Sequence, residues 1–321
     1  MNAQTTTTTR TTTPLPMPAK RMTLAAVKRG RVEQPLRVVL YGPEGIGKST
    51  FAANAPAPIF LGAEDGTAQL DVARFPEPRA WADVFDAVRE LTTAEHSYQT
   101  LAIDTLDWLE PTCWEHVCKT GGKADIEAFG YGKGYVAALE EWRRLLAALD
   151  ALRARCGMHV VILAHAHVKP FNNPDGENFD RYTMKVHEKA AGLVKEWSDA
   201  VLFAQYETFT KKDGAKSKGF STGARVVHTE RRAAWDAKNR FGLPETIALD
   251  WESFFASVAA AMAPSNAEAI RARIGAAEAE INDPTVSAWL ATNVPAAGDD
   301  TGRLTTILNR LQARLAQAAG Q

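Results

Sequence analysis

Residues 36–50 read Leu-Arg-Val-Val-Leu-Tyr-Gly-Pro-Glu-Gly-Ile-Gly-Lys-Ser-Thr. The run from Leu36 to Tyr41 is apolar and β-branched, which predicts a short buried strand. Glycines follow at three of the next six positions, and the residues from Ser49 to Asn54 are compatible with a helix. A buried strand, a glycine-rich turn and a helix in this order favour an α/β fold whose mostly parallel central sheet is flanked by helices.

The glycine-rich turn fits the pattern G-x-x-x-x-G-K-[ST] of a phosphate-binding loop. Glycine permits the backbone angles that aim successive N–H groups at one anion, and the following helix directs its positive end to the same point. Lys48 can reach the β- and γ-phosphates, and the Ser49 hydroxyl can bind Mg²⁺. An incidental glycine-rich turn is the alternative. We expect ATP and Mg²⁺ as cofactors, with the nucleotide held by Gly42, Pro43, Glu44, Gly45, Ile46, Gly47, Lys48, Ser49 and Thr50.

Composition and charge exclude several other classes of protein. The chain has 321 residues and a net charge of −1, so its global charge predicts no polyanionic partner. The three cysteines form no metal-spaced pair, and no apolar run reaches membrane-spanning length. We therefore expect a cytoplasmic protein without a membrane partner. Its expected parts are a disordered, basic arm over 1–33, an α/β core over 34–263 and a small helical module over 264–321.

Three further apolar runs, at 59–61, 100–104 and 159–164, predict strands of the same sheet. The second run ends in Asp104. Because ligands bind at the carboxyl edge of a doubly wound sheet, Asp104 is expected to be a second Mg²⁺ contact beside Ser49. Apolar spacing predicts helices between these strands, from about 81 to 91, 107 to 118 and 136 to 155.

Two polar segments, 119–135 and 169–185, have no periodic apolar face, and we expect both to be loops. They mix cations with aromatic rings, which is the chemistry that single-stranded nucleic acid requires. A plain flexible connection is the alternative for the first segment, and residues 20–37 offer a basic arm as a second place for DNA or a partner. The candidate DNA-binding residues are Lys119, Lys123, Phe129, Tyr131, Lys133, Lys169 and Phe171.

ATP hydrolysis needs a group that orients water near the γ-phosphate. In AAA+ motor ATPases this group is a Glu directly after the Walker B Asp, but here Thr105 follows Asp104. Residues 59–64 and 101–104 instead resemble the RecA class of P-loop NTPases. The resemblance assigns the role of catalytic acid to Glu64. It places His165 where RecA-like recombinases carry a γ-phosphate-sensing residue, usually Gln.

A second part of this resemblance concerns a neighbouring subunit. The run Ala237-Lys238-Asn239-Arg240 resembles the Lys-x-Lys that reaches the next subunit's nucleotide in the RecA class. It implies that Lys238 and Arg240 are catalytic groups that act across an interface. Because an unpaired charge is costly to bury, two cations on one strand are also hard to explain by packing alone. Two surface cations on a solvated edge are the alternative.

The chain resembles more closely the short phage nucleotide-binding proteins of this class, which include RecA-like single-strand annealing proteins. Residues 42–50, 131–134 and 238–244 carry the resemblance, which covers about 34 to 255. It implies a DNA-dependent ATPase that binds single-stranded DNA and promotes annealing or strand pairing in phage homologous recombination, in the host cytoplasm. It also implies a homo-oligomer, ring or filament, with a single-strand-binding protein as a further candidate partner.

Three rival functions stay open at this point. An AAA+-like motor or remodelling ATPase would form closed hexamers, and the absent Asp-Glu pair counts against it. A nucleotide kinase would need an arginine-rich lid and an acceptor pocket, and the sequence offers no clear one. A nucleotide-gated DNA-binding module with little turnover would not depend on Glu64.

Overall fold

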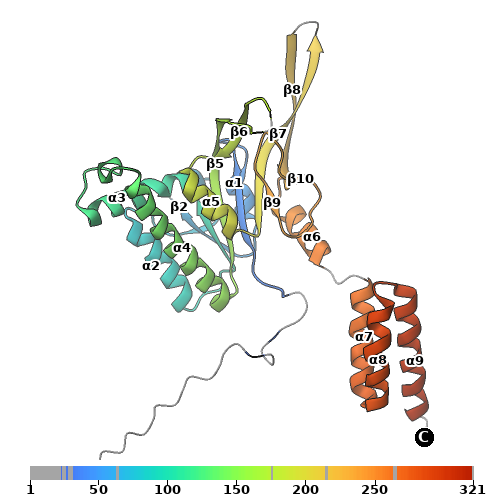
Figure 1. The fold of residues 1–321 in the computed structure, drawn as a ribbon. Coiled ribbons are helices and arrows are strands. Elements are labelled where there is room, and N and C mark those ends of the chain that lie inside the picture. Colours follow the sequence, from blue (N-terminus) through green and yellow to red (C-terminus); the bar gives the residue numbers. More distant parts are fainter. Residues whose placement is uncertain are drawn as a thin grey trace, which may run out of the picture. The chain divides into compact units, whose positions relative to one another are not determined.

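The computed structural model describes residues 23, 27, 32–62, 65–174, 176–213, 216–262 and 266–319, without the side chains of 65, 208–222 and 316–319. Strands and helices alternate through most of the α/β core (Figure 1). The strands are β1 (Arg37–Gly42), β2 (Pro58–Gly62), β3 (Ala73–Arg74), β4 (Thr100–Asp104), β5 (His159–Phe171), β6 (Phe179–Met184), β7 (Ala200–Asp213), β8 (Lys216–His228), β9 (Lys238–Asn239) and β10 (Thr246–Ala248). The helices of this part are α1 (Lys48–Ala53), α2 (Trp81–Thr93), α3 (Leu106–Gly121), α4 (Lys133–Cys156), α5 (Glu188–Trp197) and α6 (Trp251–Met262).

The strands form one mixed sheet in the order β10-β8-β7-β1-β5-β4-β2-β3. The run from β7 to β3 is parallel throughout, and antiparallel pairs occur where β8, β10, β6 and β9 join it. Strand β5 separates β1 from β4, and its register pairs Gly42 with His165. The carboxyl ends of β1, β4 and β5 therefore meet at one edge of the sheet.

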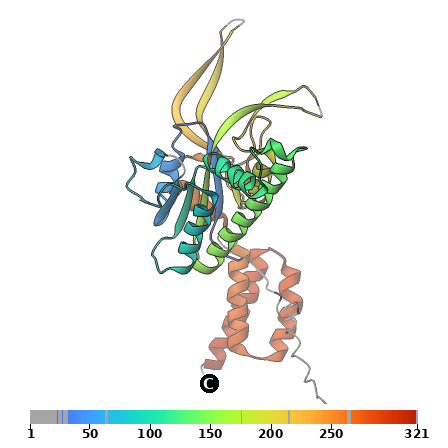
Figure 2. The same ribbon diagram turned by 90° about the vertical axis from the view of Figure 1, so that its left-hand side faces the viewer.

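Alternate residues of the central strands supply two cores, because successive side chains of a strand point to opposite faces. Val39 and Tyr41 pack with α2, α3, α4 and α5, whereas Val38 and Leu40 pack with α1 and α6. Figure 2 shows helices in front of the sheet, with the hairpins β5–β6 and β7–β8 projecting from the same end of it. The predicted α/β fold with a mostly parallel sheet flanked by helices is confirmed.

Three further helices follow the core: α7 (Asn266–Ile281), α8 (Pro284–Ala297) and α9 (Thr301–Ala319). They enclose a hydrophobic cluster of their own, which includes Ile274, Leu290 and Leu304. The predicted C-terminal helical module is therefore present. The described residues contain no helix that is both long enough and apolar enough to cross a membrane.

The expectation of a polar loop over 169–185 was wrong. Strand β5 continues to Phe171 and pairs with β6 in an antiparallel register, Lys169 opposite Arg181. The expectation of a mobile loop over 119–135 was also wrong in part. Lys119 lies in the last turn of α3, and Lys133 begins α4. The connection between these helices is packed, since a Cβ on Gly121 would lie 2.5 Å from the Phe129 ring.

Candidate functional site

The loop between β1 and α1 needs glycine at several positions. Gly45 and Gly47 have φ angles of +69° and +110°, which side chains with a Cβ resist. A Cβ on Gly42 would lie 2.5 Å from the backbone oxygen of Ala204 on β7, so the close approach of β7 excludes any larger residue. The loop therefore has the open backbone that the motif predicts for an anion cradle.

Lys48 lies at the start of α1 and is buried. Its ammonium donates to the backbone oxygens of Gly42 at 3.3 Å and Pro43 at 3.0 Å, so the side chain folds back over the loop. A cation held at the loop by two backbone oxygens can exchange them for phosphate oxygens, which suits a triphosphate.

Ser49 and Asp104 meet although 55 positions separate them in the sequence. The Ser49 hydroxyl donates to the Asp104 carboxylate at 2.6 Å. Burial raises the pKa of Asp104, while the Ser49 hydrogen bond and the Lys48 charge oppose this shift. Beside it, the buried Thr105 hydroxyl has no hydrogen-bond partner among the described residues. Two adjacent oxygen ligands and an unsatisfied hydroxyl fit a hydrated Mg²⁺, which would hold Asp104 ionised.

His165 lies at the same edge, where Asp107 holds it. The Asp107 carboxylate accepts from the His165 backbone N–H at 2.9 Å, and its second oxygen lies 2.9 Å from the ring Nδ1. Burial alone would raise the pKa of Asp107, but the hydrogen bonds from His165 outweigh it and the pKa lies below its usual range. Asp107 was not among the predicted site residues. Its place in the sequence, three residues after Asp104, was the only feature that could have indicated it.

Two more side chains reach the glycine-rich loop from the hairpin β7–β8. The Tyr206 hydroxyl donates to the Gly45 oxygen at 3.5 Å, and the Arg225 guanidinium lies against Gly47. No local motif marks either residue. The chain is folded back from more than 150 positions away to bring them there.

Glu64, the predicted catalytic acid, lies outside the described residues. Lys238 and Arg240 are described, but the structure does not bring them to the glycine-rich loop of the same chain. Strand β9 pairs with the start of β7, where Ala200 lies opposite Asn239, and this end of the sheet is remote from Gly42.

Lys238 and Arg240 have structural partners within their own chain, contrary to the expectation that packing hardly explains two cations on this strand. The Lys238 ammonium donates to the backbone oxygens of Lys195, Glu196 and Ser198 at 2.8–2.9 Å, which caps the carboxyl end of α5. The Arg240 guanidinium donates to Asp199 at 3.2 Å. Their role across a subunit interface stays a prediction, without this support.

The candidate DNA-binding cations are exposed, namely Lys119, Lys123, Lys133 and Lys169. Their aromatic companions differ from one another. The Tyr131 ring is fully exposed, whereas Phe129 is half-buried in the α3–α4 connection. Phe171 is half-buried too, 5.1 Å from the Phe179 ring and 5.1 Å from the Arg181 guanidinium. Tyr131 is thus the most accessible of the three proposed stacking faces.

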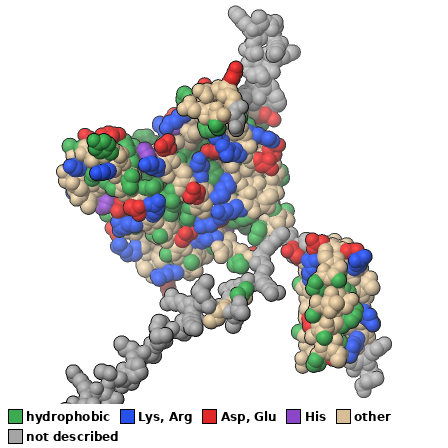
Figure 3. Space-filling view, in the orientation of Figure 1, with side chains coloured by type: hydrophobic (Ala, Val, Ile, Leu, Met, Phe, Trp, Pro, Cys, Tyr) green, Lys and Arg blue, Asp and Glu red, His purple; other side chains and the backbone are tan. Residues whose placement is uncertain are grey.

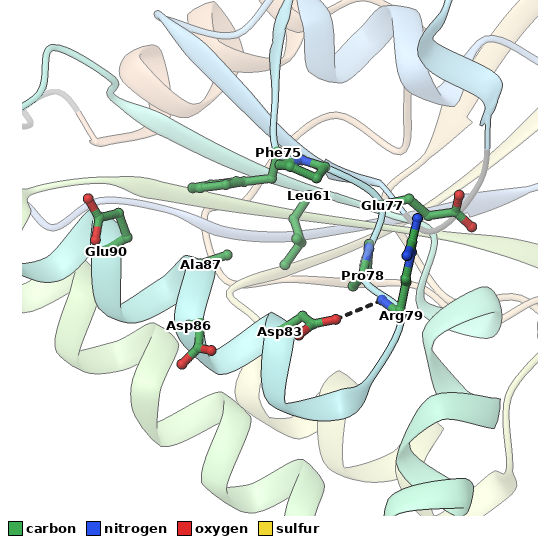
Figure 4. Close-up of a pocket in the computed structure, with 10 residues that line it drawn as sticks. Leu61, Phe75, Glu77, Pro78, Arg79, Asp83, Asp86, Ala87 and Glu90 are labelled. Carbon is green, nitrogen blue, oxygen red and sulfur yellow. Dashed lines mark hydrogen bonds between the residues drawn. The ribbon is translucent and has the colours of Figure 1, made fainter.

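A cleft of about 550 Å³ lies between α2 and the segment after β3 (Figure 4). Its wall carries the carboxylates of Glu77, Asp83, Asp86 and Glu90 and the cation of Arg79. Asp83 accepts from the backbone N–H groups of Arg79 at 2.8 Å and Ala80 at 2.9 Å, and so caps α2. Carboxylates in this excess repel phosphate, and no residue of 42–50 lines the cleft, so it is not the nucleotide site.

Comparison with known proteins gives a family and distant structural likenesses. No curated protein sequence matches the chain. Among solved structures, the crystal structure of the RadB recombinase is similar, with 15% sequence identity and a TM-score of 0.36, over 63% of this chain and 84% of that chain. The sequence profile of the family described as "AAA domain" matches residues 34–241, well over half of the chain. The chain belongs to this AAA domain family, a family of nucleotide-binding P-loop proteins.

Proposed function

We propose that the chain is an ATP-hydrolysing, RecA-like protein that binds single-stranded DNA and promotes annealing or strand pairing in phage homologous recombination. ATP and Mg²⁺ are its cofactors, and it works as a homo-oligomer. The cofactor part rests on Lys48, Ser49 and Asp104, which lie together at the carboxyl edge of the sheet.

One observation carries the link to DNA. Strand β5 pairs His165 with Gly42 of the glycine-rich loop and continues without a break to Lys169 and Phe171. The nucleotide edge and a candidate DNA-binding segment are thus four residues apart on one strand. A hydrogen-bonded strand is stiff, so a change at His165 on loss of the γ-phosphate is transmitted to the hairpin β5–β6.

The two candidate DNA segments also lie next to one another. Tyr135, at the start of α4, stacks on His187 at a ring distance of 4.3 Å, and His187 follows β6. The Lys169 charge lies close enough to Glu110 of α3 to lower the pKa of that carboxyl against the effect of burial. One strand of DNA can therefore contact both segments.

The experiment compares the wild type with Lys48→Ala in two assays. The wild type is expected to hydrolyse ATP faster when single-stranded DNA is added and to anneal complementary fluorophore- and quencher-labelled strands. Lys48→Ala should lose ATP binding or turnover, because the charge that spans the phosphates is removed. Unaltered ATPase activity in Lys48→Ala would contradict the nucleotide site. ATP turnover that does not change when DNA is added, together with no annealing, would contradict only the proposed DNA function.

An AAA+-like motor or remodelling ATPase is the second candidate, and the AAA domain family match favours it. The Thr that follows Asp104 argues against it, because the usual motor carries Glu there. Electron micrographs with an ATP analogue and single-stranded DNA separate the two. Closed hexamers that unwind duplexes or unfold proteins would support the motor.

The variant Glu64→Gln tests whether Glu64 is needed for ATP hydrolysis. In the RecA-like proposal it keeps nucleotide binding and lowers turnover by about two orders of magnitude or more, the scale of a lost general base. If Glu64→Ala leaves both turnover and DNA binding unchanged, the chain is instead a nucleotide-gated binding module.

A further inference from the structure

The base of the hairpin β7–β8 covers the glycine-rich loop. Tyr206 of β7 and Arg225 of β8 are paired in register, and the Arg225 guanidinium carbon lies 5.8 Å from the centre of the Tyr206 ring. The Tyr206 hydroxyl donates to the Gly45 oxygen at 3.5 Å. A Cβ on Gly47 would lie 2.9 Å from an Arg225 guanidinium nitrogen and 3.7 Å from a methyl group of Leu249. Both strands of the hairpin thus contact the loop.

This position gives Arg225 access to whatever the loop binds. Gly47 directly precedes Lys48, and its backbone belongs to the cradle that receives the phosphates. Arg225 is an exposed side chain, so its guanidinium is open to a ligand that enters from solvent. A guanidinium presents its donors in a planar fork that matches phosphate oxygens, and the Tyr206 ring supports its face.

We propose that Arg225 binds the phosphate chain of the nucleotide held by the glycine-rich loop of its own chain, and that Tyr206 positions the guanidinium there. Lys48 and Arg225 then hold the phosphates from two sides, one from α1 and one from β8. The inference rests on the proposed nucleotide site and adds to it a residue that no local motif identifies. Tyr206 is a positioning residue, because it acts through Arg225 and the loop.

Binding of labelled ATP and AMP to the purified chain tests this assignment. Arg225→Ala should weaken ATP binding tenfold or more and AMP binding clearly less, because AMP lacks the β- and γ-phosphates. Arg225→Lys should restore part of the loss, since it keeps the charge without the fork. Arg89→Ala is the matched control: this exposed arginine lies on α2, paired with Asp86, and its removal should change neither ligand.

The outcomes separate this inference from the function on which it rests. Normal ATP binding by Arg225→Ala, with binding lost in Lys48→Ala, would support the nucleotide site and show that Arg225 is not part of it. Normal binding by both variants would overturn the site and the inference together. Equal losses for ATP and AMP would place the guanidinium on the α-phosphate or the nucleoside and overturn the contact with the β- and γ-phosphates. A melting temperature of Arg225→Lys that equals that of the wild type, measured without nucleotide, shows that the fold is intact.

Mixing tests whether Arg225 serves its own chain. Each subunit in a mixture of Arg225→Ala and Lys48→Ala lacks one of the two cations at its own nucleotide, so turnover should not be restored. Restored turnover would place Arg225 on the neighbour's nucleotide and overturn the assignment to its own chain.

Discussion

At the scale of single residues, Glu110 offers a measurable effect of pH. It is buried on α3, and both carboxylate oxygens accept from the His187 backbone N–H at 2.9 and 3.0 Å. Burial raises its pKa from 4.5 to about 7, although the His187 hydrogen bond opposes the shift. Between these two values the folded chain binds more protons at this site than the unfolded chain. The free energy of unfolding therefore falls as pH rises through this window and is level above it.

Glu110→Gln should remove this dependence, because the amide does not ionise while its oxygen still accepts from His187. Chemical denaturation at pH 5 and pH 8 measures it. The wild type should lose on the order of 1–3 kcal/mol more than Glu110→Gln between these values, since one pKa unit corresponds to about 1.4 kcal/mol. Equal losses in both proteins would show that Glu110 titrates normally.

Residues of the site differ in how far the sequence could predict them. Lys48 and Ser49 follow from a motif of eight residues, and Asp104 follows from a strand that ends in an acid. Arg225 and Tyr206 could not be predicted, because their place over Gly47 depends on the pairing of β7 with β1 and β8. The partners of Lys238 and Arg240 could not be predicted either. Only the folded chain places the α5 carbonyls and Asp199 beside these two side chains.

At the scale of elements, apolar periodicity predicted the helices well. The expected helices at 81–91, 107–118 and 136–155 correspond to α2, α3 and α4, each extended by a few residues. The hairpin β5–β6 was missed for a physical reason. Most of the residues of β5 beyond Val168 and of β6 are exposed or half-buried, so no alternation of apolar residues marks them as strands. Their pairing is set by the antiparallel backbone register instead.

Strand β9 gives a prediction about stability. Lys238 caps three carbonyls at the end of α5, and burial lowers its pKa, with the nearby Arg240 adding to the shift. Lys238→Met removes these hydrogen bonds and the favourable charge at the helix end. We expect a loss of about 1–2 kcal/mol in the free energy of unfolding, measured by urea denaturation.

Arg240→Ala is the comparison for this prediction. Its guanidinium is half-exposed and shares Asp199 with Arg37, so its removal should cost less than the loss of Lys238. A larger loss for Arg240→Ala, or none for Lys238→Met, would contradict the capping role.

At the scale of the whole molecule, the net charge does not indicate a surface for the proposed DNA binding. On the face of the α/β core visible in Figure 3, Lys and Arg side chains lie among Asp and Glu, in keeping with the net charge of −1. The proposed binding of DNA must then depend on local cations. We expect the affinity for a single-stranded homopolymer to fall with salt, and replacement of Lys123, Lys133 and Lys169 by alanine to reduce the slope of that fall.

The matched control replaces three exposed arginines on α2 and α4, namely Arg89, Arg143 and Arg155. They have the same total charge, so the control variant should keep the wild-type slope if the lysines are specific. The same slope in the lysine variant would place the DNA elsewhere, and the basic residues before Arg37 would be the next candidates.

Assembly decides whether Lys238 and Arg240 also act in catalysis. Both lie far from the glycine-rich loop of their own chain, so any contact with a nucleotide must be made to a neighbouring subunit. In an oligomer where Arg240 approaches the neighbour's γ-phosphate, it would stabilise charge that develops during transfer, as an arginine finger does. Its bond to Asp199 is half-exposed and weak enough to be exchanged for a phosphate.

Mixed oligomers test this role directly. A Lys48→Ala subunit supplies an intact Arg240, and an Arg240→Ala subunit supplies an intact glycine-rich loop. If the finger acts in trans, each variant alone is inactive and the mixture regains part of the ATPase activity under assembling conditions. Arg225→Ala mixed in the same way should regain none, because its partner loop lies in its own chain. Full activity of Arg240→Ala alone, or no rescue at any mixing ratio, would leave Arg240 as a surface partner of Asp199 and nothing more.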